Sequence, residues 1–126
     1  SDKEKVKSML QLIKEREDFV RTINYEKFST NVVENYYEII KELASALILL
    51  NGLKATGENA HKDLIDYLVN YKNFTEGDIT FMNDLRIKRN NSLYDGKKIE
   101  PIYLKNNKNR ILELIEKLNK LIIAKL

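Results

Sequence analysis

Apolar residues recur at the three- to four-residue spacing of an α-helix in five separate stretches of the chain. The first stretch predicts a helix from about residue 2 to residue 21. The second predicted helix begins near Ser29, where Asn31 is placed to cap it and Glu34 stands three residues later in the capping-box position. Its last turns, ASALILL, are apolar on every side, so we expect this to be the central and most buried helix.

Three further helices are predicted in the second half of the chain. An Asn-Gly pair at 51–52 stops the second helix, and Asn59 is placed to cap a third, shorter one. Thr75, with Asp78 three residues later, starts a fourth helix with acidic side chains at its positive end. The last helix follows Pro101. No strand pattern is present, so the predicted fold class is all-α: an up-and-down antiparallel bundle of about five helices.

Length and composition fit one small domain, residues 1–126. One proline and four glycines favour long helices over a turn-rich β fold. The longest uncharged apolar run, residues 43–53, is only 11 residues long, which is too short to cross a bilayer. No basic-then-apolar signal segment opens the chain. We therefore expect a cytoplasmic protein with no membrane contact.

Few residues are available for metal or nucleophilic chemistry. The chain has no cysteine and a single histidine, His61, and the nearby Asp63 and Asp66 do not share a helical face with it. We predict no metal site and no cofactor. His61 is expected to be a partly buried polar residue that contacts a neighbour, rather than a residue that catalyses a reaction alone.

The net charge of +3 is unevenly distributed along the chain. Residues 26–80 carry five basic and nine acidic side chains, whereas residues 81–126 carry eleven basic and five acidic ones. This asymmetry is compatible with a phosphate-bearing partner. For the lysines of the last helix a solvated helix face is the simpler interpretation. For the basic cluster at 86–89 the two interpretations are equally open.

The fourth predicted helix contains a basic interruption of its apolar stripe. The stripe of residues 79–85 meets Arg89 where a leucine would continue it, and Arg86 and Lys88 crowd the same turn. An unpaired buried charge is costly, so Arg89 must find a partner or an anion. The Asn90-Asn91-Ser92 run that follows has poor helix propensity, so we expect the helix to end near Ser92.

The segment Arg89-Asn90-Asn91-Ser92-Leu93-Tyr94 resembles the signature of HEPN domains, small helical proteins named for higher eukaryotes and prokaryotes nucleotide-binding. That signature is an arginine, usually followed by Asn, Asp or His, and then a histidine after four to six intervening residues. The surrounding order is also similar: a glycine-containing connection, a short helix with an early histidine (Ala60-His61-Lys62), and then the helix that carries the motif. In layout, the resemblance covers most of the chain.

This resemblance implies a metal-independent ribonuclease site at a symmetric dimer interface, of the kind found in toxin–antitoxin or RNA-defence systems. Some such proteins pair with a small nucleotidyltransferase. The resemblance implies that Arg89 binds the scissile phosphate and that the residue at the histidine position, here Tyr94, performs acid–base work. Arg86, Lys88 and Asn90 would complete the phosphate site, with Asn90 orienting the arginine. We expect a homodimer that packs its fourth helices together.

Tyr94 stands where the signature has a histidine. Tyrosine side chains titrate near pH 10 and histidine side chains near pH 6.5, so tyrosine is a poor proton shuttle at neutral pH. On a continuous helix, five positions at about 100° per residue place Arg89 and Tyr94 about 140° apart. The two side chains converge only if the helix ends or bends between them, or if a second protomer contributes its copy.

Three hypotheses about function follow. The first is a divergent HEPN protein that binds RNA or a nucleotide phosphate through the basic cluster at a dimer interface, with weak or no ribonuclease activity. In the second, Arg89 is a buried, hydrogen-bonded structural group that sets the dimer register of a partner-binding subunit. The third is an active metal-independent ribonuclease that uses Tyr94 or His61.

Overall fold

Residues 2–126 of the computed structural model form five α-helices and one short 3-10 turn, with no strand among them. The elements are α1 (Asp2–Arg21), α2 (Ser29–Leu50), α3 (Ala60–Tyr67), η1 (Leu68–Asn70), α4 (Glu76–Asp95) and α5 (Pro101–Lys125). The predicted all-α bundle of five helices is confirmed. Within this part of the chain, no helix combines the length and the apolar character that crossing a membrane requires.

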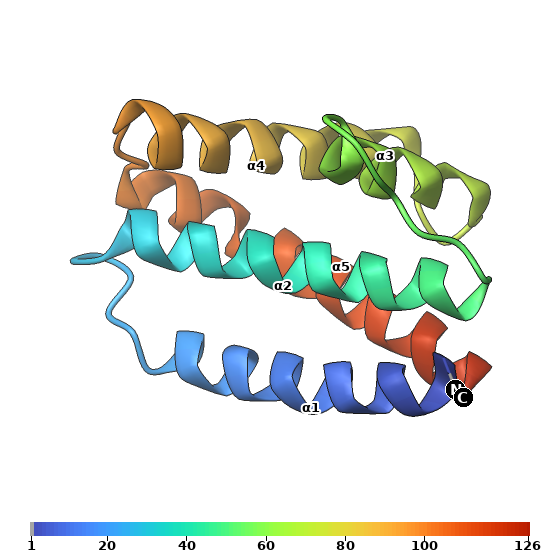
Figure 1. The fold of residues 1–126 in the computed structure, drawn as a ribbon. Helices are drawn as coiled ribbons and strands as arrows, with labels where there is room; N and C mark the ends of the chain where they lie inside the picture. Colours follow the sequence, from blue (N-terminus) through green and yellow to red (C-terminus); the bar gives the residue numbers. More distant parts are fainter. Residues whose placement is uncertain (1) are drawn as a thin grey trace.

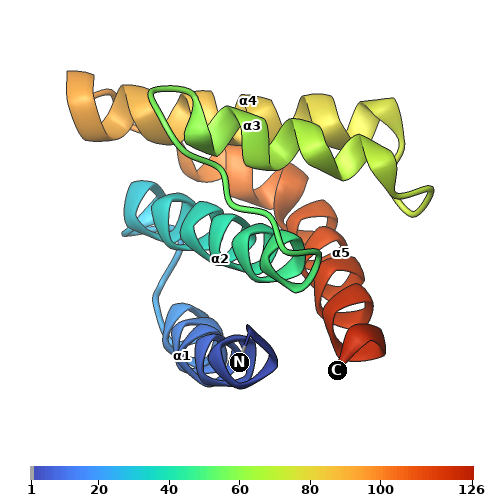
Figure 2. The same ribbon diagram turned by 45° about the vertical axis from the view of Figure 1, so that its right-hand side comes forward.

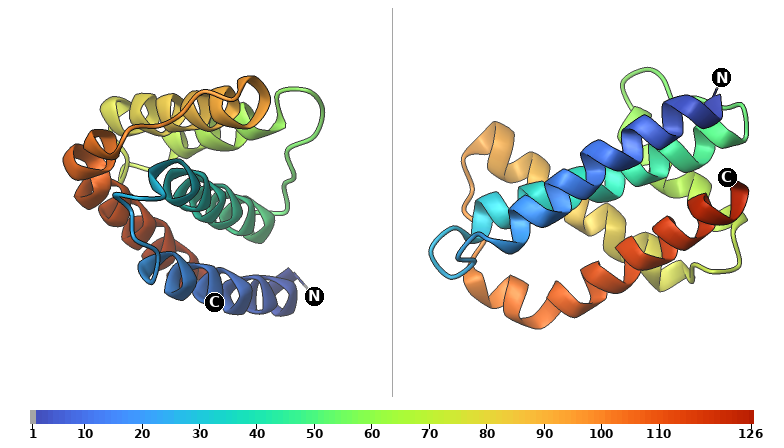
Figure 3. Two further views of the ribbon diagram at one scale, coloured as in Figure 1. Left: turned by 90° about the vertical axis from the view of Figure 1, so that its left-hand side faces the viewer. Right: turned by 90° about the horizontal axis from the view of Figure 1, so that it is seen from below.

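The central helix is α2, as its apolar last turns predict. It lies between α1 on one side and the layer of α3 and α4 on the other, and α5 crosses it obliquely (Figure 1, Figure 3). The helix contributes fully buried side chains along most of its length, among them Val33, Tyr37, Ile39, Ile40, Leu43 and Leu47. Because α2 packs against every other α-helix, it contributes more buried apolar residues to the core than any other element.

The four long helices, α1, α2, α4 and α5, alternate in direction along the chain (Figure 1). The short α3 departs from this alternation and runs in the same direction as α2. Figure 2 shows the reason: the 51–59 connection passes from the end of α2 back along the bundle before α3 begins. As a result, the start of α3 lies beside the C-terminal half of α4, where the basic interruption occurs.

The start of α2 falls at Ser29 as predicted, but its first turn is held differently from the prediction. The helix begins at Ser29, Asn31 lies inside its first turn, and the preceding residue makes no side-chain capping bond. The first turn instead meets the backbone of Ile99: the Ser29 hydroxyl donates to the carbonyl oxygen, and the Thr30 hydroxyl accepts the Ile99 N–H at 3.0 Å. The predicted capping box at Asn31 is therefore wrong, because a contact with a distant segment holds the first turn.

The starts of α3 and α4 fall where the sequence places them. Thr75 and Asp78 form a capping box in which each side chain accepts the other residue's backbone N–H at 3.0 Å. Asn59 occupies the N-cap position of α3, but its side chain makes no capping hydrogen bond. The first turn of α3 therefore keeps backbone N–H groups that have neither an intrahelical partner nor a capping side chain.

The end of α4 lies beyond the predicted position. The helix continues past Ser92 to Asp95, and Gly96 ends it in the left-handed conformation with φ of 65°. The Ser92 hydroxyl lies 3.1 Å from a carboxylate oxygen of Glu34 on α2, which ties this turn to the bundle. The predicted end near Ser92 is wrong, because tertiary contact and the glycine terminus outweigh the poor local propensity of the Asn-Asn-Ser run.

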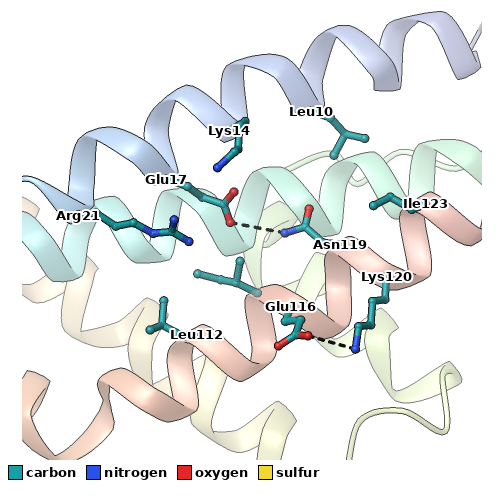
Figure 4. Close-up of a pocket in the computed structure, with 10 residues that line it drawn as sticks. Leu10, Lys14, Glu17, Arg21, Leu112, Glu116, Asn119, Lys120 and Ile123 are labelled. Carbon is teal, nitrogen blue, oxygen red and sulfur yellow. Dashed lines mark hydrogen bonds and ion pairs between the residues drawn. The ribbon is translucent and has the colours of Figure 1, made fainter.

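A groove of about 550 Å³ runs between α1 and α5, on the side of α2 away from α3 and α4 (Figure 1, Figure 4). Leu10, Leu112 and Ile115 supply its apolar lining. Glu17 and Asn119 reach toward each other across it, with 3.5 Å between the carboxylate oxygen and the amide nitrogen. The groove is the largest hollow described, and it lies apart from the basic residues of α4.

Candidate functional site

Arg89 turns toward the interior of the bundle and finds two partners there. One terminal nitrogen of its guanidinium group, Nη2, lies 3.1 Å from Nδ1 of His61 on α3. The guanidinium carbon lies 4.6 Å from the ring centre of Tyr37 on α2, a cation–π distance. The predicted need of Arg89 for a partner is thus met in part within the chain, by an imidazole and an aromatic ring, while its Nε is buried without a hydrogen-bond partner.

The contact with Arg89 determines the protonation state of His61. A guanidinium group only donates hydrogen bonds, so Nδ1 of His61 must accept, and the ring proton sits on Nε2. Burial, and then the positive charges of Lys41 and Arg89, hold the pKa of His61 below its ordinary value. At neutral pH, His61 is therefore an uncharged imidazole whose remaining nitrogen is a hydrogen-bond donor.

An ion cluster on α2 lies next to this pair. Lys41 Nζ lies 2.7 Å from Glu38 and 3.3 Å from Glu42, and only 18% of the Lys41 side chain is exposed. Burial would lower the pKa of Lys41, but hydrogen bonding and charge attraction from Glu38 and Glu42 outweigh it and raise the pKa. The cluster therefore stays charged and adds a fixed cation to the surroundings of His61.

A depression of about 280 Å³ opens beside His61, between the start of α3 and α4. The segment 57–62 forms one wall, and Arg86, Asn90 and Tyr94 form the other. Arg86 donates to the side-chain oxygen of Asn83 at 3.3 Å and forms no ion pair with any carboxylate of the described residues. A guanidinium group without a carboxylate partner thus lines a hollow that is also lined by the uncapped first turn of a helix.

The residues that the sequence singles out divide between three environments. Arg86, Asn90 and Tyr94, spaced four residues apart on α4, share the face that lines the depression. Arg89 faces the interior, and Lys88 faces away, with its ammonium group 4.8 Å from the ring centre of Tyr103 on α5. Because α4 is continuous through Tyr94, Arg89 and Tyr94 do not meet within one chain.

Tyr94 is largely solvent-exposed, with 73% of its surface accessible. Ile87, one heptad before it on the same outer side of α4, is 46% exposed. Thr80, Asn91 and the charged, exposed Asp84 complete this outer strip. A strip that carries an exposed aromatic and an exposed aliphatic residue is typical of a protein interface.

Metal chemistry has no candidate in this region. Among residues 2–126, no three His, Cys, Asp or Glu side chains are grouped closely enough to hold a metal ion. The depression has one carboxylate in its lining, Glu58, and its N–H donors come from Arg86, Lys62, Asn90, His61 and the first turn of α3. Such a set suits an anion with several acceptor oxygens.

The stability of the fold is expected to fall as the pH is lowered through the range in which His61 titrates. Because the pKa of His61 is lower in the folded state, the unfolded chain binds the proton first. By linkage, the free energy of unfolding then decreases below about pH 6.5, by at most about 1.4 kcal/mol per pH unit for one proton. Chemical denaturation between about pH 7 and pH 5.5 measures this decrease.

The matched control for this titration is His61→Asn, which keeps an acceptor oxygen for Arg89 but cannot titrate. Its free energy of unfolding should change less than that of the unmodified protein over the same pH range. An equal pH dependence in both proteins would contradict a lowered pKa at His61.

Comparison of the chain with models of known protein families, with characterised proteins and with solved structures finds no match.

Proposed function

We propose that this chain is a divergent HEPN-type protein that binds RNA through a phosphate group in the depression between α3 and α4, with little or no ribonuclease activity. The observation that carries the proposal is the convergence of Arg86, Asn90 and His61 with the uncapped start of α3 around one depression. A phosphate would supply acceptor oxygens to these donors, and Arg86, which has no carboxylate partner, would supply the charge.

Arg89 has a supporting role in this proposal. Its guanidinium group holds Nδ1 of His61, which fixes the ring orientation and keeps the proton on Nε2. Its contact with Tyr37 ties the pair to the central helix. Arg89 therefore positions a phosphate donor, whereas Arg86 contacts the phosphate itself.

Cleavage of the bound RNA would need a group that moves a proton at neutral pH. His61, the only histidine, has one nitrogen occupied by Arg89 and a lowered pKa, so it is uncharged and poorly suited to act as a general acid. Tyr94 is largely solvated and lies on a different side of α4 from Arg89. These two features favour binding over ribonuclease activity.

The homodimer is part of the same proposal. The outer strip of α4 (Thr80, Asp84, Ile87, Asn91 and Tyr94) borders the depression through Tyr94. Twofold packing of α4 against its copy would cover Ile87 and Tyr94 and bring two depressions together across one interface. An RNA strand could then contact both protomers.

A second candidate function rests on the burial of Arg89 between His61 and Tyr37. In this alternative the motif is structural, and the protein is the partner-binding subunit of a pair, for example with a small nucleotidyltransferase. The outer strip of α4 would then contact that partner instead of a second copy.

The proposal is tested by fluorescence anisotropy with a labelled single-stranded RNA. Arg86→Ala should weaken binding about tenfold, the effect of losing about 1.4 kcal/mol in a charge-assisted contact. Lys88→Ala is the matched control, because Lys88 lies two positions away but faces Tyr103. Binding should also weaken with added salt.

The same RNA is incubated with the protein in the presence of a chelator to test for cleavage. Intact RNA is the expected result. Chelator-resistant cleavage that is lost in Arg86→Ala would establish the active ribonuclease instead. RNA affinity that is unchanged by Arg86→Ala would contradict the phosphate site and favour the partner-binding subunit.

A further inference from the structure

A second basic surface lies at the end of the bundle where α2 and α5 begin, at the left of Figure 1. Its backbone comes from the 22–28 connection, the 96–100 connection and the first turns of α5. The contacts of Ser29 and Thr30 with Ile99 join the two connections. We call this region the end surface; its side chains are Tyr25, Lys27, Phe28, Lys97, Lys98, Ile102, Lys105 and Lys108.

Aromatic rings and lysines alternate on the end surface. The Lys108 ammonium group lies 5.5 Å from the ring centre of Tyr25, and that of Lys27 lies 5.3 Å from the ring centre of Phe28. Phe28 is 45% exposed. Tyr25 also lines a hollow of about 370 Å³, together with Lys105 and three other residues. The end surface therefore places the aromatic side chains of Phe28 and Tyr25 beside the positive charges of Lys27 and Lys108.

The charge of the end surface is not balanced by its own carboxylates. None of its five lysines forms an ion pair with a described carboxylate. Residues 22–28 and 96–108 contain only two acidic side chains, Glu26 and Glu100. Unpaired cations beside exposed rings form the combination with which proteins hold single-stranded nucleic acid, by contacts to the backbone and by stacking of bases.

We propose that the end surface binds the single-stranded extension of an RNA whose phosphate occupies the depression, and this inference rests on the proposed function. The face of α4 that carries Arg86, Asn90 and Tyr94 leads directly to Lys97 and Lys98 at the helix end. At 1.5 Å per residue, Arg86 and Lys97 lie about 16 Å apart, which about five nucleotides span at stacked spacing.

An anionic membrane is the competing partner for a surface with lysines and exposed apolar side chains. The shape of the end surface favours RNA. The Tyr25 ring lines a hollow instead of protruding, which suits a stacked base better than insertion among lipid headgroups.

The length of the RNA separates the two sites in an experiment. Labelled oligouridylates of about four and about twelve nucleotides are titrated by anisotropy, since only the longer one reaches the end surface. Phe28→Ala and the double variant Lys97→Ala with Lys98→Ala should each weaken binding of the longer RNA about tenfold and leave the shorter unchanged. Phe19→Ala is the matched control, because Phe19 is 58% exposed on α1.

Each alternative outcome overturns a different statement. If the end-surface variants bind the longer RNA normally while Arg86→Ala binds it weakly, the proposal that the end surface binds RNA is wrong and the proposed function stands. If Arg86→Ala also binds both RNAs normally, the proposed function fails. Vesicles of phosphatidylcholine and phosphatidylserine that bind the protein through Phe28, with RNA affinity unaffected, would identify the end surface as a membrane contact instead.

Discussion

The free energy of unfolding is expected to fall by about 2–3 kcal/mol when Arg89 is replaced with alanine. The substitution removes the hydrogen bond to His61 and the cation–π contact with Tyr37 at once. It also leaves a part-buried imidazole nitrogen without a donor and opens space between α2, α3 and α4. Urea denaturation at pH 7 measures the change.

Two further variants separate this effect from a general loss of charge. Arg86→Ala removes the same side chain three residues earlier, where it faces the solvent-filled depression, and should change the free energy of unfolding by no more than about 0.5 kcal/mol. Arg89→Lys keeps the cation but lacks the planar fork, so an intermediate loss is expected. Arg89→Ala with unchanged stability would contradict the structural pairing of Arg89 with His61.

Replacement of Ile87 with aspartate is expected to raise the dissociation constant of the proposed dimer at least about 100-fold, a change of about 2.7 kcal/mol. The proposed twofold packing would bury two copies of Ile87, so each substitution acts twice. Each copy loses the apolar contribution of a buried isoleucine and places a second carboxylate near Asp84 in the interface. Sedimentation over a range of protein concentrations measures the dissociation constant.

Leu12→Asp is the matched control for the dimer prediction, because Leu12 is 66% exposed on α1, away from α4. Its dimer should dissociate at the same concentration as the unmodified protein. Because both side chains are exposed in the single chain, neither variant should unfold the monomer. A protein that is monomeric at every concentration, or a dimer that tolerates Ile87→Asp, would rule out packing through α4.

The helical fold could be predicted from the sequence because its signals are local and repeated. The apolar spacing gives α1 its limits, and the Thr75–Asp78 capping box marks the start of α4 without reference to the rest of the chain. The wrong cap of α2 and the wrong end of α4 have a common cause. The first turn of α2 is held by Ile99, and the last turns of α4 depend partly on Glu34, so in both cases residues distant in sequence decide the local structure.

The candidate site could be predicted only in part. The position of Arg89 on an apolar stripe correctly indicates that it needs a partner, but the identity of that partner depends on how the 51–59 connection folds back along the bundle. No spacing rule relates His61 to Arg89 across 28 residues. The separation of Arg89 from Tyr94 follows from helical periodicity once α4 is known to be continuous, whereas the predicted end at Ser92 allowed the two side chains to converge.

The phosphate site is tested most directly by NMR of the His61 ring during titration with single-stranded RNA. His61 is the only histidine in the chain, so its ring signals are assigned without ambiguity. We expect nitrogen shifts of a neutral ring protonated on Nε2 in the free protein. On titration, the Nε2 and ring-proton signals should shift with the same dissociation constant that anisotropy gives. Arg86→Ala should raise the dissociation constant to the same extent in both measurements. RNA that binds to saturation without moving the His61 signals would contradict a phosphate site between α3 and α4.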